Sequence, residues 1–100
     1  MAKMVDLKTE SKPAFLRRSR IDILACILEN SVSGSRKTRL IYGCNLSLPQ
    51  FNQYRNYLVE SQLVKVSRQG GVEIFETTEK GREFLRDYGK IRAVLDRMRS

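Results

Sequence analysis

Apolar residues recur at helical spacing in three successive stretches, which predict helices over residues 20–30, 36–44 and 48–60. Ser19 and Ser35 precede the first two stretches and are expected to be their N-caps. The residues expected to face the core are Ile21, Leu24, Ala25, Ile27 and Leu28 in the first helix, Leu40, Ile41 and Cys44 in the second, and Leu48, Phe51, Tyr54 and Leu58 in the third. These three amphipathic helices could bury one core.

The clearest helix start in the sequence is a capping box at Ser47 and Gln50. Ser47 can accept a hydrogen bond from the backbone N–H of Gln50, and the Gln50 side chain can reach back. Leu46 and Phe51 flank the box as a hydrophobic staple. Asn45 can adopt the left-handed conformation that ends the preceding helix. Two short helices joined by so tight a turn predict a helix-turn-helix.

Strand-like sequence follows the third helix. Residues 63–68 and 72–77 are rich in β-branched side chains and predict two strands joined by a turn at residues 69–71. Gly70 and Gly71 permit positive φ angles in that turn. A hairpin directly after a helix-turn-helix is typical of the wing of a winged helix.

The last helix carries a second kind of apolar pattern. Thr78 is its expected N-cap, and Gly81 allows close packing. From Phe84 onward, Tyr88, Ile91, Leu95 and Met98 follow at alternating steps of four and three residues, the a/d spacing of a coiled coil. A small winged domain cannot easily cover this whole seam, so pairing with a second chain is favoured over folding back on the same chain.

These elements predict an α+β, mainly α fold: a winged helix-turn-helix followed by a long C-terminal helix that forms a coiled-coil dimer. The expected organisation is a flexible basic N-terminal tail over residues 1–18, the winged domain over 19–80 and a dimerisation helix over 81–100. The basic run at residues 17–20 is either an arm along phosphates or a solvated terminus.

Charge indicates what the winged domain binds. The 100 residues carry 19 Lys and Arg against 11 Asp and Glu, a net charge of +8 and a pI near 9.9. Residues 1–70 hold twelve basic and five acidic side chains, whereas residues 71–100 hold seven and six. The balance favours an anionic partner, nucleic acid first and acidic lipid second.

Composition also excludes several chemistries. The absence of histidine removes Ser-His-Asp and Cys-His catalysis and nearly every catalytic zinc site. The two cysteines, Cys26 and Cys44, lie among apolar neighbours and are expected to be buried thiols in a reducing compartment. No apolar run is long enough to span a bilayer, and the N-terminus lacks a signal peptide. We therefore expect a soluble, cytoplasmic, nucleoid-associated protein with no cofactor, no metal and no small-molecule substrate.

The candidate DNA-binding residues are polar or basic and lie at the second helix, the third helix and the wing. The first turn of the second helix collects cations, which are unfavourable against the helix dipole unless they face phosphate. Asn and Gln pair with adenine edges, and Arg pairs with guanine, in the major groove. The candidates are Arg36, Lys37 and Arg39 in the second helix, Gln50, Asn52, Gln53, Arg55 and Asn56 in the third, and Lys65, Arg68 and Gln69 in the wing. An ordinary solvated polar face is the alternative for the third helix.

The run from Gly34 to Ser47 (GSRKTRLIYGCNLS) resembles the helix-turn-helix of the small archaeal "10a" proteins, basic winged-helix chromatin proteins of thermophilic crenarchaea. The similarity continues through Tyr54 and Leu58 and the Thr-x-x-Gly entry to the last helix at residues 78–81. It covers roughly residues 19–98. The resemblance implies a homodimer held by an antiparallel coiled coil of the last helices, with two winged domains contacting duplex DNA.

The leading function is therefore a dimeric duplex-DNA-binding protein, either architectural or a transcriptional regulator. A protein-interaction adaptor is the alternative, since a fold does not fix a function. An enzyme is not expected. The carboxylates that cluster, Glu73, Glu76, Glu79 and Glu83, are interpreted as solvated charge on the wing and last helix rather than as a metal site.

Overall fold

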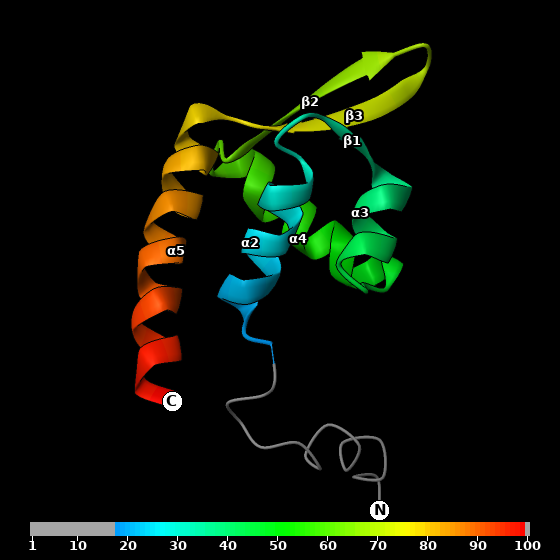
Figure 1. Cartoon of the computed structure of the whole chain (residues 1–100). Coiled ribbons are helices and arrows are strands. Elements are labelled where there is room, and N and C mark those ends of the chain that lie inside the picture. The colour runs from blue at the N-terminus through cyan, green and yellow to red at the C-terminus, as the bar shows by residue number, and fades with distance from the viewer. Residues whose placement is uncertain (1–17, 100) are drawn as a thin grey trace, which may run out of the picture.

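The computed structural model describes residues 18–99, so the predicted tail lies outside the described residues except for Arg18. The elements are α2 (Arg20–Asn30), β1 (Ser35–Arg36), α3 (Lys37–Gly43), α4 (Leu48–Glu60), β2 (Val64–Gln69), β3 (Val72–Thr77) and α5 (Glu79–Arg99). The helices α2, α3 and α4 lie together beneath the sheet, α5 runs beside α2, and the β2–β3 hairpin extends away from the body (Figure 1). This is a winged helix-turn-helix followed by a long C-terminal helix.

The sheet has three antiparallel strands in the order β1-β3-β2. The predicted hairpin is confirmed: Gln69 pairs with Val72, and Gly70 and Gly71 turn the chain with φ angles of 61° and 81°. Strand β1 was not predicted. A two-residue strand is too short to show any periodicity in the sequence. In the structure, Ser35 of β1 pairs with Phe75 of β3.

The core forms where the three helices meet β2 and β3. Leu28, Leu40, Phe51, Leu58 and Phe75 each expose 2% or less of their surface. The rings of Phe51 and Phe75 meet edge to face, with centroids 5.6 Å apart, which attaches α4 to the central strand. The remaining members of the cluster are Ile23, Leu24, Ile27, Cys44, Leu46, Leu63 and Val64.

Side-chain hydroxyls satisfy the carbonyl groups at the end of α2. Ser31 donates to the carbonyl of Ile27 at 2.8 Å, and Thr77 of β3 donates to that of Leu28 at 2.6 Å. Ser35 of β1 donates to the carbonyl of Asn30. Helix ends leave such carbonyls without intrahelical partners, so these bonds join α2 to the sheet at a buried position.

Within residues 18–99, the apolar side chains of α5 that pack against the core come from its first half. Gly81 lies so close to the domain that an added Cβ would come within 2.4 Å of the Leu63 carbonyl oxygen, which explains the glycine. Phe84 and Leu85, one turn after Gly81, and Tyr88, two turns after it, are half-buried. The Tyr88 hydroxyl donates to the Asp22 carboxylate of α2 at 2.6 Å.

The hydrogen bond between Tyr88 and Asp22 shifts the pKa values of both side chains. Partial burial and the nearby carboxylate raise the pKa of Tyr88 to about 12. The hydroxyl of Tyr88, followed by the backbone and side chain of Ser19, lowers the pKa of Asp22 despite some desolvation. The pair therefore stabilises the contact between α2 and α5 at neutral pH.

The predictions for three residues are wrong: Ile21 and Leu48 were expected in the core, and Ser35 was expected to be an N-cap. Ile21 is 54% exposed and Ile23 is buried in its place, while Leu48 is 50% exposed. Both misplaced residues lie in the first turn of a helix, where fewer neighbouring elements are available to cover them. Ser35 is a strand residue, and Arg36 is the N-cap of α3 without a side-chain capping bond. The N-caps Ser19 and Ser47, both with capping boxes, are confirmed.

The expectation of two separate thiols is also wrong. Cys26 of α2 and Cys44, the residue that ends α3, form a disulfide across 18 residues of sequence. Cys44 is buried as expected, whereas Cys26 is only half-buried. Sequence spacing does not reveal the pair, because the packing of α3 against α2 brings the two residues together.

Candidate nucleic-acid interface

A groove of about 370 Å³ lies where the start of α3 meets the tip of the wing. Its cationic lining comes from two distant stretches of sequence: Arg36 and Lys37 from the strand-to-helix junction, and Arg68 from β2. The remaining lining is Thr38, Gly71, Val72 and Glu73. Three of the predicted contacts thus share one concave surface.

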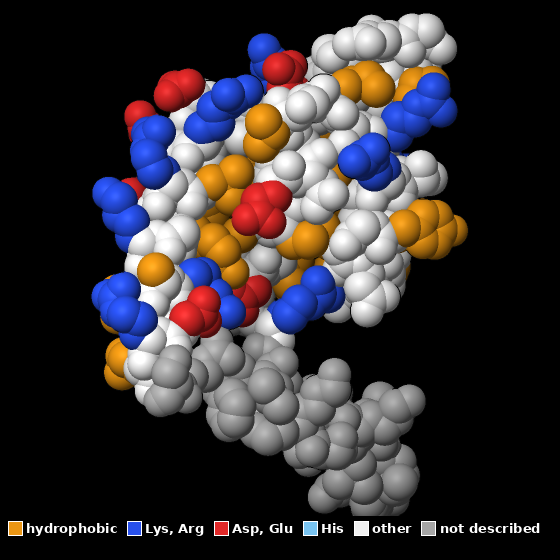
Figure 2. All heavy atoms as spheres, in the orientation of Figure 1, with side chains coloured by type: hydrophobic (Ala, Val, Ile, Leu, Met, Phe, Trp, Pro, Cys, Tyr) orange, Lys and Arg blue, Asp and Glu red, His pale blue; other side chains and the backbone are white. Residues whose placement is uncertain are grey.

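The cations of this surface differ in how far they are neutralised. Arg36, Lys37 and Arg39 are exposed, and none forms an ion pair within residues 18–99. In the wing, Lys65 pairs with Glu76 at 3.7 Å, and Arg68 lies 3.8 Å from Glu73. At the right of Figure 2, beside α3 and the wing, the visible charged side chains are Lys and Arg. The start of α3 is therefore the stronger attractor of anions.

The two faces of the wing carry different predicted contacts. The pairing of Arg68 with Glu73 and of Val66 with Phe75 places Arg68 on the face that packs toward the core and α4. Lys65 and Gln69 alternate with these residues and so lie on the opposite face. The structure brings Arg68 toward the α3 cations and leaves Lys65 and Gln69 on the other side of the hairpin.

Arg55 holds α4 to the wing. Its guanidinium donates to Glu73 at 3.2 Å and lies 5.6 Å from the centre of the Phe75 ring. Its side chain is 31% exposed, and it shares Glu73 with Arg68. Arg55 is one of the predicted DNA contacts, and in the structure its guanidinium is engaged by Glu73 and the Phe75 ring.

The outward face of α4 is polar. Asn52, Gln53 and Asn56 are exposed, and their side chains make no hydrogen bond within the described residues. Gln50 is exposed too, but its amide oxygen accepts from the backbone N–H of Ser47 at 2.9 Å. Gln53 borders a hollow of about 330 Å³ between α2 and α4, lined also by Arg20, Leu24, Tyr54 and Tyr57.

The sequence reasoning missed one prominent residue of this region. Tyr42, on the exposed side of α3, has 82% of its surface in solvent. It lines a second hollow with Arg36, Thr38 and Arg39, on the β1 side of the sheet. Its place three residues after Arg39 was the available signal, because residues three apart share a helix face.

Arg18, from the predicted basic run, is used within the fold. Its guanidinium donates to the carbonyls of Cys44 and Asn45 at 2.6 and 3.3 Å, at the turn between α3 and α4. The turn has the predicted form, with Asn45 at a φ of 55°. Arg17 lies outside the described residues.

The outer half of α5 presents a different surface. Ile91, Leu95 and Met98 of the predicted seam are exposed, and Val94 joins them. Phe84 and Tyr88, the first two seam residues, face the chain's own domain. Along α5, at the left of Figure 2, basic side chains alternate with acidic ones. α5 thus carries seven basic and four acidic side chains around an exposed apolar stripe.

No helix within residues 18–99 is both long enough and apolar enough to cross a membrane. In the same stretch, His, Cys, Asp and Glu side chains nowhere gather in threes that could hold a metal ion.

Known proteins share this architecture. The chain is similar to Sso10a-2, a DNA-binding protein from Sulfolobus solfataricus, with 26% identity and a TM-score of 0.68 over 82% of this chain and 90% of that one. It also shares the fold of a mutant of Lactococcus lactis ZitR solved in complex with DNA, with 18% identity and a TM-score of 0.66 over 99% of this chain and 80% of that one. No curated protein matches the chain. The first likeness confirms the resemblance to the 10a proteins.

The sequence model of one family matches residues 17–96, most of the chain. The match includes every described element except the last residues of α5. The chain belongs to the winged helix-turn-helix family.

Proposed function

We propose that the protein binds duplex DNA as a homodimer. The observation that carries the proposal is the groove between α3 and the wing, where Arg36, Lys37 and Arg68 converge. Phosphate neutralisation by Lys and Arg supplies most of the non-specific affinity for DNA. The similarity to Sso10a-2, described as a DNA-binding protein, supports the same reading.

The cations at the start of α3 are proposed to contact the phosphate backbone. Among residues 18–99, Arg36, Lys37 and Arg39 have no ion pair that binding would have to break. Arg68 joins them from the wing, while Lys65 and Gln69 reach only DNA that passes the opposite face of the hairpin. Arg55 acts as a positioning residue, because it fixes α4 against β3.

The polar face of α4 is proposed to enter the major groove. Asn56 lies on the most outward part of the helix, opposite the buried Phe51 and Leu58, and Asn52 and Gln53 flank it. Their free amides can pair with adenine edges. Any preference for one sequence over another would come from these residues.

The apolar stripe of α5 is proposed to pair with the same stripe of a second copy. Ile91, Val94, Leu95 and Met98 recur at helical spacing and are exposed among the described residues. The proposed seam therefore begins at Ile91, because Phe84 and Tyr88 contact their own domain. Two linked winged domains would bind DNA with avidity that one domain lacks.

The test is a salt titration of DNA binding by the wild type and the triple variant Arg36→Glu, Lys37→Glu, Arg39→Glu. We expect the variant to bind all duplexes more weakly and its log–log salt slope to fall by up to about 2.7, since each neutralised phosphate contributes about 0.9. The matched control reverses Arg86, Lys90 and Arg97 of α5, which changes the net charge equally, and should retain the wild-type slope. An unchanged slope in the α3 variant would remove α3 from the phosphate backbone.

The choice of duplexes separates the possible roles. Near-equal affinity for random and candidate operator duplexes indicates an architectural protein, and a large preference for one duplex indicates a regulator. Failure of the wild type to bind any duplex at low salt would favour the protein-interaction adaptor.

A further inference from the structure

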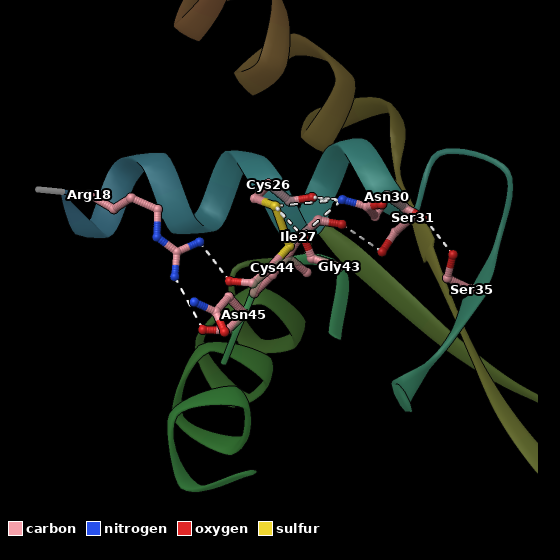
Figure 3. Close-up of a disulfide and its surroundings, with 9 residues drawn as sticks. All are labelled: Arg18, Cys26, Ile27, Asn30, Ser31, Ser35, Gly43, Cys44 and Asn45. Carbon is pink, nitrogen blue, oxygen red and sulfur yellow. Dashed lines mark hydrogen bonds between the residues drawn. A yellow bond between two sulfur atoms is a disulfide. The ribbon is translucent and has the colours of Figure 1, made fainter. Parts of the chain in front are cut away.

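The disulfide lies at the hinge of the proposed DNA-binding surface. Cys26 occupies the middle of α2, and Cys44 is the residue that ends α3, three residues before the N-cap of α4 (Figure 3). The loop that the bond closes contains β1 and all of α3, including the three unpaired cations. The covalent link thus joins α2 to the turn that sets the position of α3 relative to α4.

The two sulfur atoms differ in access and share one polar neighbour. Cys44 exposes only 1% of its surface, whereas Cys26 is half-buried. The Asn30 amide nitrogen lies 3.6 Å from the Cys26 sulfur and 3.7 Å from the Cys44 sulfur. On the other side of Cys44, Arg18 binds the carbonyls of the turn (Figure 3). Of the two cysteines, Cys26 is therefore the more accessible to a thiol from solvent.

We propose that the Cys26–Cys44 disulfide is a thiol-reducible switch that controls DNA binding through the α3–α4 turn. The oxidised protein is the tighter DNA binder, and reduction by a small thiol weakens binding. This inference rests on the proposed function of α3 and α4.

The chemistry is thiol–disulfide exchange with two electrons supplied by two thiols. A thiolate attacks the Cys26 sulfur, the bond between the two protein sulfurs breaks, and Cys44 leaves with the electron pair as a thiolate. Asn30 is placed to donate an N–H to that leaving sulfur. A second thiolate then attacks the reductant's sulfur in the mixed disulfide and releases Cys26. The products are two protein thiols, after protonation, and one oxidised disulfide of the reductant.

Reduction removes the covalent link between α2 and the α3–α4 turn. The disulfide closes the loop that contains α3, so its loss widens the range of positions open to α3 relative to α4. DNA then has to re-order a looser turn on binding, and we expect affinity to fall by about 5–150-fold, the range of typical coupling between sites.

The experiment measures binding of one fluorescent duplex at fixed salt by oxidised wild type and by wild type reduced with dithiothreitol. A thiol reagent counts free cysteines in each sample, with none expected before reduction and two after. Cys26→Ala, which cannot form the bond, is the matched control. It should bind like reduced wild type and show no response to dithiothreitol.

Several results would overturn the switch. These are equal affinity of the oxidised and reduced wild type, tighter binding by the reduced form, or two reactive thiols in protein prepared under an oxidant. If Cys26→Ala does not fold, wild type in a series of glutathione buffers replaces it, and affinity should follow the thiol count with one midpoint. If oxidised and reduced protein bind no duplex at all, the proposed function fails. If both bind equally, only the switch fails.

Discussion

Helices α4 and α5 are both amphipathic, but the apolar face of α4 is buried, whereas much of the apolar face of α5 is exposed. In α4, Phe51 and Leu58 are each 1% exposed because the sheet and α2 cover them. In α5, Ile91 and Leu95 remain 57% and 42% exposed, although Tyr88 and Arg92 of the same helix are half-buried. The outward face of α4 is polar, with Asn52, Gln53, Asn56 and one acid, Glu60, whereas α5 carries both acids and bases around its stripe.

This difference indicates two kinds of partner. A helix with a satisfied core face and free amides outside is suited to a hydrated, polar surface such as a DNA groove. A helix with an exposed apolar stripe flanked by both acidic and basic side chains is suited to another apolar helix. The four predictions below test this division, in order of decreasing expected effect.

The largest effect is expected from Leu95→Asp, which places an unpaired charge in the stripe of α5. The protein should sediment as a monomer at tens of micromolar, and DNA affinity should fall by about 100-fold or more as avidity is lost. Ala93→Asp is the matched control, since Ala93 is exposed on another side of the same helix and the charge change is identical. A Leu95→Asp protein that remained dimeric would place the interface elsewhere.

The double variant Gln53→Ala, Asn56→Ala tests whether α4 reads bases. We expect discrimination between a preferred and a scrambled duplex to fall by about tenfold or more, since one good base contact is worth about 1–3 kcal/mol. Affinity for the scrambled duplex should hardly change. Equal losses on both duplexes, measured by anisotropy, would mean that α4 contacts only the backbone.

Glu73→Gln addresses the link between α4 and the wing. Glu73 accepts from Arg55 and lies near Arg68, so its neutralisation frees positive charge beside the groove. DNA affinity should rise by about two- to fivefold at low salt. Stability should fall by under about 1 kcal/mol, because the pair is partly exposed.

Glu83→Gln is the control for Glu73→Gln. It changes the net charge by the same amount at an exposed position of α5 that has no ion pair within the described residues. Equal gains in affinity for the two variants would show that net charge, and not the groove, is responsible.

The smallest effect concerns the contact between α2 and the first half of α5. Tyr88→Phe removes the hydrogen bond to Asp22 and should cost about 1 kcal/mol at pH 7, measured by denaturant unfolding. The folded state lowers the pKa of Asp22 below its usual 3.8, so this contribution is present above pH 3.8 and is lost as the pH falls through the lowered value.

At high pH the same bond depends on the Tyr88 proton. Folding raises its pKa from 10.0 to about 12, so the contribution is full below pH 10 and disappears as the pH rises through 12. Tyr42→Phe removes an exposed hydroxyl without a hydrogen bond to residues 18–99 and should leave stability unchanged. A pH-independent difference between Tyr88→Phe and wild type would contradict the assigned role of Asp22.

The sequence by itself determined the features that depend on near neighbours. The capping boxes at Ser19 and Ser47, the left-handed Asn45 and the Gly70–Gly71 turn each involve residues within a few positions of one another. The winged fold class and the cation cluster at the start of α3 follow from such local patterns and their order. The resemblance to the 10a proteins, carried by the run at residues 34–47, pointed to the same fold.

Only the tertiary structure decided the features that join distant segments. Cys26 and Cys44 form a disulfide, and Ser35 pairs with Phe75 as part of β1. Arg55 donates a hydrogen bond to Glu73, and Arg18 donates one to the carbonyl of Cys44 at the α3–α4 turn. The tertiary structure also buried Ile23 in place of Ile21 and divided the wing contacts between two faces. Periodicity shows which residues of an element share a face, but which partner covers that face depends on contacts across the whole chain.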